Sequence, residues 1–278
     1  MDTLLVTGGE GFIGGKIVQL SGAESYDLKS GKDILALEML SLACEGVTGI
    51  FHCAARISVP ESFQIPEEYN RTNVEGVRAV IQVAESLGAK VVFSSSAAVY
   101  GESNRPALES DLFHPLSPYA ENKCDGESIL NEALCPSVIL RYFNVYGPGQ
   151  SAAYAGVITA FIRAAIRGED LIIYGDGTQI RDFVYVDDVA KANIAALESN
   201  LQGEVFNIAS GSKTSISQLA DEIIRLTNSS SKIVYVPARE GDILYSQADV
   251  SKAEVLLGWR AEVDLKEGLR RTIELFKN

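Results

Sequence analysis

The stretch TLLVTGGEGFIGG at residues 3–15 decides the fold of this 278-residue chain. Its apolar part, Thr3–Thr7, predicts a strand, and Phe12–Leu20 predicts a helix that starts inside a glycine-rich turn. Three glycines of the turn have the spacing GxxGxxG: Gly8, Gly11 and Gly14. Glycine adopts the backbone conformations that such a turn needs, and it leaves room for a pyrophosphate beside the main chain and the helix N-terminus. Placed between a first strand and a first helix, this turn predicts a dinucleotide site.

Strands and helices alternate through the first half of the chain. Further β-rich runs are Ser25–Leu28, Gly49–Cys53, Lys90–Ser95 and Ser137–Phe143. Helical periodicity is found between them, from about Glu67 to Leu87 and over Pro118–Leu134. Strands alternating with helices indicate parallel βαβ units, so we predict an α/β fold with a Rossmann-type doubly wound parallel sheet. All strand carboxyl ends then meet at one rim, where ligands bind.

The pattern loosens after Asn144, where a turn cluster, YGPG at 146–149, interrupts it. Helices are predicted at Ala155–Arg167, Val189–Glu198 and Ile216–Leu226, strands at Leu171–Tyr174, Phe183–Val186 and Val205–Ile208, and closing segments at Lys232–Val236 and Leu265–Phe276. We therefore predict a dinucleotide-binding domain of residues 1–145 plus 183–208. A smaller, discontinuous C-terminal lobe of residues 146–182 plus 209–278 is predicted to bind the substrate.

Composition limits the classes of partner. The formal net charge of -13 should repel a polyanion, so we expect no nucleic acid. The four cysteines are scattered and the two histidines lie far apart, so we expect no metal site and free thiols in a reducing cytoplasm. The sequence has neither a basic, signal-like start nor an apolar run of about 20 residues, so we expect a cytoplasmic protein without membrane segments.

Asp27 is the candidate for the adenosine ribose, because it ends the second predicted strand at the usual distance from the glycine turn. Its charge opposes a 2′-phosphate and favours NAD over NADP, although Lys29 nearby weakens that preference. A plain turn role for Asp27, before Ser30 and Gly31, stays open. We expect Asp33 and Ile34 to flank the adenine.

Tyr119 and Lys123 form a YxxxK pair, and positions i and i+4 share one face of a helix. Lys123 is expected to hold the cofactor ribose and to lower the pKa of the Tyr119 phenol from about 10, so that the phenol can act as a base. Ser96, at the end of a serine run that closes a strand, is expected to hydrogen-bond the same substrate oxygen. An isolated YxxxK pair is common on helices, but the upstream glycine turn and the serine run favour a catalytic role.

These residues carry a family resemblance. The chain resembles the extended short-chain dehydrogenase/reductase superfamily, and within it the UDP-glucose 4-epimerases and their near relatives. The matching stretches follow the expected order across nearly the whole chain: TGGEGFIGG (7–15), HCAA (52–55), NVEG (73–76), FSSSAAVYG (93–101), SPYAENK (117–123), LRYFNVYGPGQ (140–150), RDFVYVDD (181–188) and PAREGD (237–242).

The resemblance implies an NAD-dependent 4-epimerase of UDP-glucose and UDP-galactose that works through a transient 4-keto sugar, with Tyr119 as base. With the residue-based candidates, the expected NAD contacts are Gly8, Gly11, Phe12, Ile13, Gly14, Asp27, Asp33, Ile34, Ala54, Ala55, Asn73, Ser94, Tyr119, Lys123 and Tyr142. The expected contacts of the sugar nucleotide are Ser96, Tyr119, Asn144, Tyr174, Arg181, Arg239, Asp242 and Ser246. Relatives also pair the helices near 67–87 and 118–134 in a four-helix bundle, so we expect a homodimer.

Two arginines also make physical sense by themselves, because forked guanidinium groups match a diphosphate. Arg181 and Arg239 would supply the local positive field that the acidic chain lacks, although an ion pair of Arg181 with Asp182 stays open. Ser246 aligns with a position that limits bulky 2-substituents, so we expect tolerance of UDP-N-acetylhexosamines. A shift of one residue would place Tyr245 there and reverse that expectation.

Several rival functions remain. A 4,6-dehydratase needs an acid and a base beside the catalytic serine, and Ala97 and Ala98 stand there, so dehydration is disfavoured. A uronate epimerase or decarboxylase needs a cation facing C6, which the sequence does not identify. A non-catalytic NAD-binding sensor often lacks the tyrosine or the lysine, and both are present. The segment between Asp27 and Gly49 is shorter than in typical relatives, so one strand of the usual sheet is expected to be rudimentary or missing.

Overall fold

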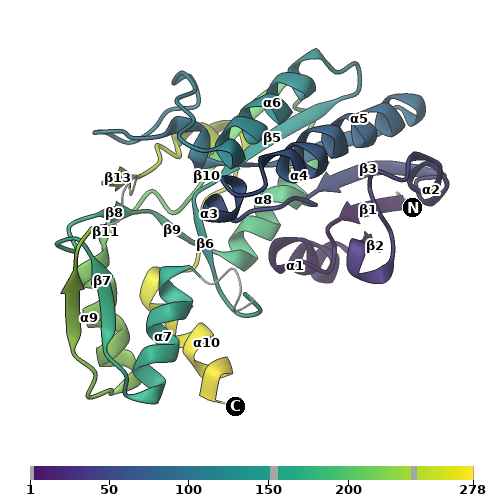
Figure 1. Ribbon diagram of the computed structural model, residues 1–278. Coiled ribbons are helices and arrows are strands. Elements are labelled where there is room, and N and C mark those ends of the chain that lie inside the picture. Colours follow the sequence, from purple (N-terminus) through teal and green to yellow (C-terminus); the bar gives the residue numbers. More distant parts are fainter. Residues whose placement is uncertain (1–2, 151–155, 239–242, 278) are drawn as a thin grey trace.

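The computed structural model describes residues 3–150, 156–238 and 243–277, and a six-stranded parallel sheet lies at its centre (Figure 1). The strand order is β10-β5-β4-β3-β1-β2. These strands are β1 (Thr3–Thr7), β2 (Glu24–Tyr26), β3 (Val47–His52), β4 (Lys90–Ser96), β5 (Ser137–Tyr142) and β10 (Glu204–Ile208). The order reverses between β1 and β3, which is the switch point where ligands bind in such sheets. The predicted doubly wound α/β fold is confirmed.

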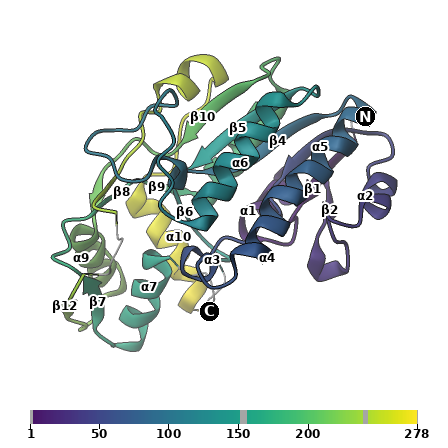
Figure 2. The same cartoon turned by 45° about the horizontal axis from the view of Figure 1, so that its top comes forward.

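Helices cover both faces of the sheet (Figures 1 and 2). One face packs on α2 (Leu37–Ala43), α5 (Gly76–Leu87) and α6 (Pro118–Glu132), and the other on α1 (Phe12–Ser21) and α8 (Val186–Glu198). Each face has its own buried apolar cluster. The two faces are therefore dry, as the continuous apolar strands predict.

The edge of the sheet beside β2 differs from the prediction. The predicted strand 25–28 ends early, because Asp27 caps a 3-10 turn over Leu28–Ser30 by accepting a hydrogen bond from the Lys29 amide. Among the described residues 27–46, the turn and α2 are the regular elements, and no strand follows β2. The shortened segment thus leaves β2 as the last strand on this side, which agrees with the expected loss.

The helix predicted from about 67 to 87 contains a change of pitch. It begins as α4 (Pro66–Asn70), passes through a π-helical turn at Arg71–Glu75, and continues as α5. Side-chain periodicity does not reveal a π turn, which adds one residue to a helical turn and often marks a functional site. A short helix, α3 (Val59–Ser62), precedes this segment.

A second lobe has its own apolar core. It is built from α7 (Val157–Arg167), β7 (Leu171–Tyr174), α9 (Ile216–Thr227), β12 (Ile233–Val236) and α10 (Leu265–Lys277). Residues 183–185, predicted with the dinucleotide-binding part, form β9 and pair with β6 (Asn144–Tyr146). Phe183 and Tyr185 contribute to the core of the second lobe. The exact residue boundaries of the two parts stay a prediction.

A three-stranded sheet joins distant segments near the rim, in the order β11 (Thr214–Ser215), β8 (Ile180–Arg181), β13 (Tyr245–Ser246). These two-residue strands are too short for a sequence pattern to predict. In the part of the chain that the structure describes, no helix has the length and apolar character needed to cross a membrane.

Helix α6 lies close against β4 because Gly126 faces Phe93. A Cβ atom at Gly126 would lie 2.8 Å from Cζ of the Phe93 ring. The helix begins after Ser117, whose hydroxyl accepts a hydrogen bond from the Ala120 amide, and Pro118 takes the first helical position. This close packing sets how far the first turn of α6 stands from the end of β4.

We predict that Gly126→Ala destabilises the protein by about 1 kcal/mol, because overpacking costs about 1–3 kcal/mol and outweighs the helix propensity gained. Denaturant unfolding measures the difference. A variant as stable as the natural protein, or more stable, would show that α6 does not depend on this contact.

Candidate active site

Three predicted reactive side chains meet at the carboxyl rim of the sheet. Ser96 ends β4, Tyr119 lies in the first turn of α6, and Lys123 follows one turn later. The Ser96 side chain acts on the Tyr119 phenol, whose pKa it lowers, and Nζ of Lys123 donates to the carbonyl oxygen of Ser94 at 2.7 Å. The structure therefore places a phenol, a hydroxyl and an ammonium group together, as the sequence predicts.

Burial controls the electrostatics of this cluster. It lowers the pKa of Lys123 to about 8, while the Cys53 thiol and the Glu127 carboxylate act in the opposite direction. Burial also raises the pKa of Tyr119, and the hydrogen bond from Ser96 opposes that rise. The expected lowering of the Tyr119 pKa by Lys123 is not met in this structure. Nζ of Lys123 lies 5.9 Å from the phenol ring centroid and bonds to a carbonyl oxygen instead.

The glycine turn forms a narrow backbone cradle. Gly8 has a φ of +72°, and a Cβ atom there would lie 2.7 Å from the Ala54 amide nitrogen. A Cβ atom at Gly14 would lie 2.1 Å from the Gly8 carbonyl oxygen. Gly11 caps α1 without a side-chain bond, and the described first turn of that helix, which includes Phe12 and Ile13, holds no acid. Its amide groups thus suit a phosphate, and the cradle fits a dinucleotide.

Asp27 is buried beside this turn, with 8% of its surface exposed. Its two carboxylate oxygens accept hydrogen bonds from the amides of Glu10 and Lys29, each at 2.9 Å. Asp27 therefore fixes the loop, as the alternative reading expects. Each carboxylate oxygen keeps capacity for a further donor, so the ribose contact stays a prediction.

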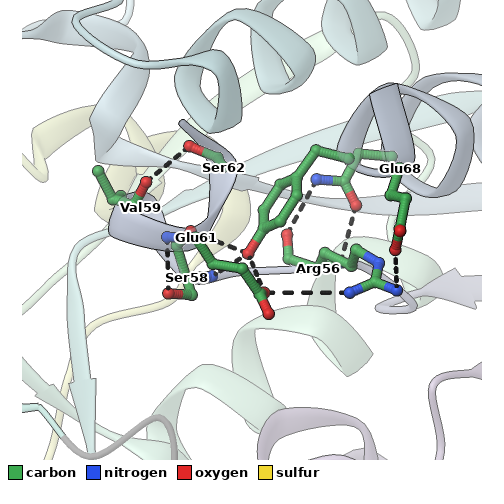
Figure 3. Close-up of polar contacts among 8 residues, drawn as sticks. Arg56, Ser58, Val59, Glu61, Ser62 and Glu68 are labelled. Carbon is green, nitrogen blue, oxygen red and sulfur yellow. Dashed lines mark hydrogen bonds and ion pairs between the residues drawn. The ribbon is translucent and has the colours of Figure 1, made fainter. Parts of the chain in front are cut away.

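The loop that follows β3 is held by side chains of the helical segment that contains the π turn (Figure 3). The Asn73 amide accepts a hydrogen bond from the Arg56 nitrogen at 2.8 Å and donates to its carbonyl oxygen at 2.9 Å. The Tyr69 hydroxyl accepts from the Ser58 amide at 2.9 Å and bonds to the Ser58 carbonyl at 2.8 Å. Sequence reasoning placed Asn73 near the cofactor and missed Tyr69.

A charged clamp lies on the outer side of the same loop. Nη2 of Arg56 lies 2.7 Å from the Glu68 carboxylate, and Nη1 lies 4.0 Å from that of Glu61 (Figure 3). The loop also holds Ala54 and Ala55, both expected cofactor contacts. The protein's own contacts therefore fix the loop conformation, which reduces the conformational entropy lost when a ligand binds.

The remaining expected cofactor residues lie on several elements. The Tyr142 hydroxyl lies 3.1 Å from Oγ of Ser94 and donates to Asn193 on α8 at 2.8 Å. Ile34 is buried, and its Cδ1 lies 2.5 Å from the place a Cβ atom would occupy at Gly76. The Asp33 carboxylate accepts from the Leu35 amide at 2.9 Å.

The expected substrate residues lie between the sheet rim and the second lobe. Arg181 and Ser246 are paired neighbours on β8 and β13, and Tyr174 ends β7. The Asn144 amide nitrogen and side chain both donate to the Asp182 carbonyl oxygen at 3.0 Å. Two further expected contacts, Arg239 and Asp242, lie outside the described residues.

Asp182 is a buried hydrogen-bond centre that sequence reasoning considered only as an ion-pair partner of Arg181. Its carboxylate accepts from the amides of Ser210, Gly211 and Ala248 and from the Ser210 hydroxyl. Burial nevertheless raises the pKa of Asp182 to about 6. These bonds tie β8 to the segments on both sides of it.

Comparison with known proteins places the chain among sugar-nucleotide enzymes. Residues 4–209 match the family model described as the NAD dependent epimerase/dehydratase family. A putative UDP-glucose 4-epimerase of Methanocaldococcus jannaschii is 38% identical, with 99% of this chain and 98% of that protein covered. A UDP-N-acetyl-alpha-D-glucosaminuronate decarboxylase of Bacillus cytotoxicus is also 38% identical, with 82% and 76% covered. The solved UDP-N-acetylglucosamine 4-epimerase of Methanobrevibacter ruminantium, in complex with UDP-N-acetylmuramic acid, superposes with a TM-score of 0.93 at 36% identity, with 99% of this chain and 98% of that chain covered.

We predict that Gly14→Ala weakens NAD binding at least tenfold, because its methyl group would collide with the Gly8 carbonyl and open the cradle. Gly15→Ala is the matched control, since its Cβ atom would stand 3.4 Å from the nearest oxygen, that of Gly9. The control should keep its NAD affinity and gain up to about 1 kcal/mol of stability from helix propensity. Calorimetric titration with NAD measures both, and equal affinities would contradict the role of the cradle.

Proposed function

Since the chain belongs to the NAD-dependent epimerase/dehydratase family, we propose that it is a 4-epimerase of UDP-hexoses, with UDP-glucose and UDP-galactose as its substrate pair. The observation that carries this proposal is the pair of Ser96 at the end of β4 and Tyr119 in the first turn of α6, with the buried Lys123 one helical turn further on. Inversion at C4 needs one group that removes and returns a proton at the 4-oxygen. This pair supplies it beside a cradle that fits NAD.

The residues divide the reaction between them. When bound, NAD supplies a hydride acceptor and donor for C4 of the sugar. Tyr119 takes the proton of the 4-hydroxyl group and later returns it, while Ser96 donates a hydrogen bond to the same oxygen. Lys123 would hold the cofactor ribose, and its stabilisation of the phenolate belongs to the cofactor-bound site, because Nζ here lies 5.9 Å from the phenol ring centroid. The 4-keto sugar turns within the pocket between the two half-reactions, so the opposite face receives the hydrogen.

The wider site supports an anionic nucleotide. We assign the pyrophosphate of NAD to the glycine turn and the α1 amides, and its adenosine ribose to Asp27. We assign the sugar-nucleotide diphosphate to Arg181 on β8 and, from the sequence alone, to Arg239. Tyr174 lines the uracil, and Asn144 and Asp242 complete the nucleotide contacts. The two arginines would provide a local positive potential for the anionic substrate in a chain whose net charge is -13.

The size of Ser246 supports a broader substrate range. Its β-strand partner is Arg181, so both residues belong to the same short sheet. A serine there leaves room for an N-acetyl group, and the Methanobrevibacter ruminantium relative is itself a UDP-N-acetylglucosamine 4-epimerase. We expect slower but detectable conversion of UDP-N-acetylglucosamine, and no conversion at all would remove this extension.

A uronate substrate is the second candidate, because one relative at 38% identity is a glucosaminuronate decarboxylase. A dehydratase is disfavoured, since Ala97 and Ala98 directly follow Ser96 and their methyl groups transfer no protons.

One NMR assay of the product sugars separates these functions. An inverted C4 centre indicates epimerisation, a 4-keto-6-deoxy sugar indicates dehydration, loss of the carboxylate from a UDP-uronate indicates decarboxylation, and no change indicates a sensor.

We predict that Tyr119→Phe lowers the rate of UDP-galactose inversion at least a hundredfold, because general acid–base groups contribute about 10²–10⁴-fold. The ring remains in place, so the affinity for NAD should stay within about twofold of the natural value. NMR of the product sugar and titration with NAD measure the two effects. Inversion at the natural rate would refute Tyr119 as the base.

The pH dependence follows from Lys123. Burial lowers its pKa to about 8, so the side chain is cationic below that pH and neutral above it. Since the proposed mechanism needs the cation, kcat/KM should fall as the pH rises through about 8, because this parameter reports groups of the free enzyme. Initial rates at low substrate concentration in a set of buffers spanning this range test the point. A kcat/KM that stays level or rises there would contradict the role of the ammonium group.

A further inference from the structure

We propose that the buried ion pair Glu127–Arg141 is a positioning device that holds the Ser96 and Tyr119 hydroxyl groups at reactive distance. The inference rests on the proposed function, because it takes Ser96 and Tyr119 as the reacting pair. Neither Glu127 nor Arg141 touches the expected substrate. Both act through the strand and the helix that carry the reactive groups.

Helix α6 is fastened to β4 at two successive strand residues. Lys123 donates to the carbonyl oxygen of Ser94 at 2.7 Å, and the Ser95 hydroxyl donates to Oε1 of Glu127 at 2.5 Å. Lys123 and Glu127 are one helical turn apart, and Ser94 and Ser95 directly precede Ser96. These two bonds therefore set the register between the helix that carries Tyr119 and the strand that ends in Ser96.

Arg141 on β5 locks the carboxylate of Glu127 in a forked arrangement. Nε lies 2.9 and 3.2 Å from its two oxygens, and Nη2 lies 2.6 Å from Oε2. The side chains of Arg141 and Glu127 are only 4% and 1% exposed. A bidentate pair shielded from water has little freedom to shift, so Ser95 is held against a rigid acceptor.

The same guanidinium group also fixes the chain after Ser96. Nη1 of Arg141 donates to the Tyr100 hydroxyl at 2.9 Å, and Tyr100 lies in the 3-10 turn η3 (Ala97–Tyr100) that begins directly after Ser96. Tyr100 in turn donates to Oδ1 of Asn207 on β10 at 2.6 Å. The network thus binds side chains on both sides of Ser96, namely Ser95 directly before it and Tyr100 four residues after it.

Stability alone does not explain such an arrangement. Burying a charge pair costs desolvation energy, and apolar side chains of similar size often stabilise a core equally well. A hydrogen-bonded pair with fixed geometry instead specifies one placement of β4, β5 and α6. A misplacement of reacting groups by about 1 Å costs up to about a hundredfold in rate, so this precision matters at Ser96.

Ser95→Ala is the sharpest test, because it removes the link to the strand and leaves Glu127 paired with Arg141. Tyr100→Phe breaks the link on the other side. Thr272→Val is the matched control, since its fully buried hydroxyl donates to the Gly268 carbonyl at 2.7 Å in α10, within the second lobe. Each protein is assayed for Tm, for NAD affinity, and for kcat and KM with UDP-galactose.

We expect Ser95→Ala and Tyr100→Phe each to lower kcat about tenfold with KM changed less than about twofold. Thr272→Val should lower the Tm by a similar amount to the two network variants and leave kcat unchanged. A kcat in both network variants equal to that of the control would overturn the proposal, because the network would then only stabilise the fold.

Failure of the proposed 4-epimerase function can be told apart from failure of the positioning role of Glu127 and Arg141. If the natural protein converts no UDP-sugar, the function is wrong, and crystal structures of the natural protein and Ser95→Ala then decide the inference. A separation of the Ser96 and Tyr119 hydroxyl oxygens that is at least about 1 Å longer in the variant supports the positioning role. An unchanged separation overturns it.

Discussion

The packing of helix α6 against strand β4 is the contact on which the rest of the site depends. Gly126 lets the helix approach the Phe93 ring, and Lys123 crosses the remaining gap to the Ser94 carbonyl. Any residue larger than glycine would push the helix outward and lift the first turn, which carries Tyr119, away from the strand end. Catalytic geometry here thus depends on core packing, and the Glu127–Arg141 network adds polar links between the same helix and strand.

The cofactor side relies on backbone shape more than on side-chain chemistry. The glycine turn closes on the Ala54 amide and on its own carbonyl groups, and Asp27 fastens it from the next strand. The opposite border, the loop after β3, is held by Asn73 and Tyr69. The glycine turn and the loop after β3 therefore lie next to each other at the switch point of the sheet. Because the chain as a whole is acidic, an anionic substrate needs a local cation, and Arg181 on β8 is the proposed one among the described residues.

Local signals predicted the central elements well. The strand at Thr3–Thr7, the helix after it and the YxxxK face of α6 follow from periodicity and from glycine spacing. The structure departs from prediction where a side chain competes with the backbone, as Asp27 does when it ends β2 early. It also departs from prediction at Arg71–Glu75, because the spacing of apolar residues in the sequence does not distinguish a π turn from an α-helical turn.

The parts of the site that were missed depend on long-range pairing. Glu127 and Arg141 are 14 positions apart and become partners only when β5 lies beside β4. A charged residue at an otherwise buried position of a helix is a usable signal for such pairs. Asp182 was likewise visible in the sequence, but its partners Ser210 and Ala248 come from distant turns. Neither the pKa of Tyr119 nor that of Lys123 followed from spacing, because both depend on burial.

The most direct test is a crystal structure of the protein with NAD and a UDP-hexose bound. We predict that the 4-oxygen of the sugar lies within about 3.2 Å of both the Tyr119 and the Ser96 hydroxyl oxygens, the reach of a hydrogen bond. A 4-oxygen held by other side chains, with Tyr119 out of reach, would contradict the account.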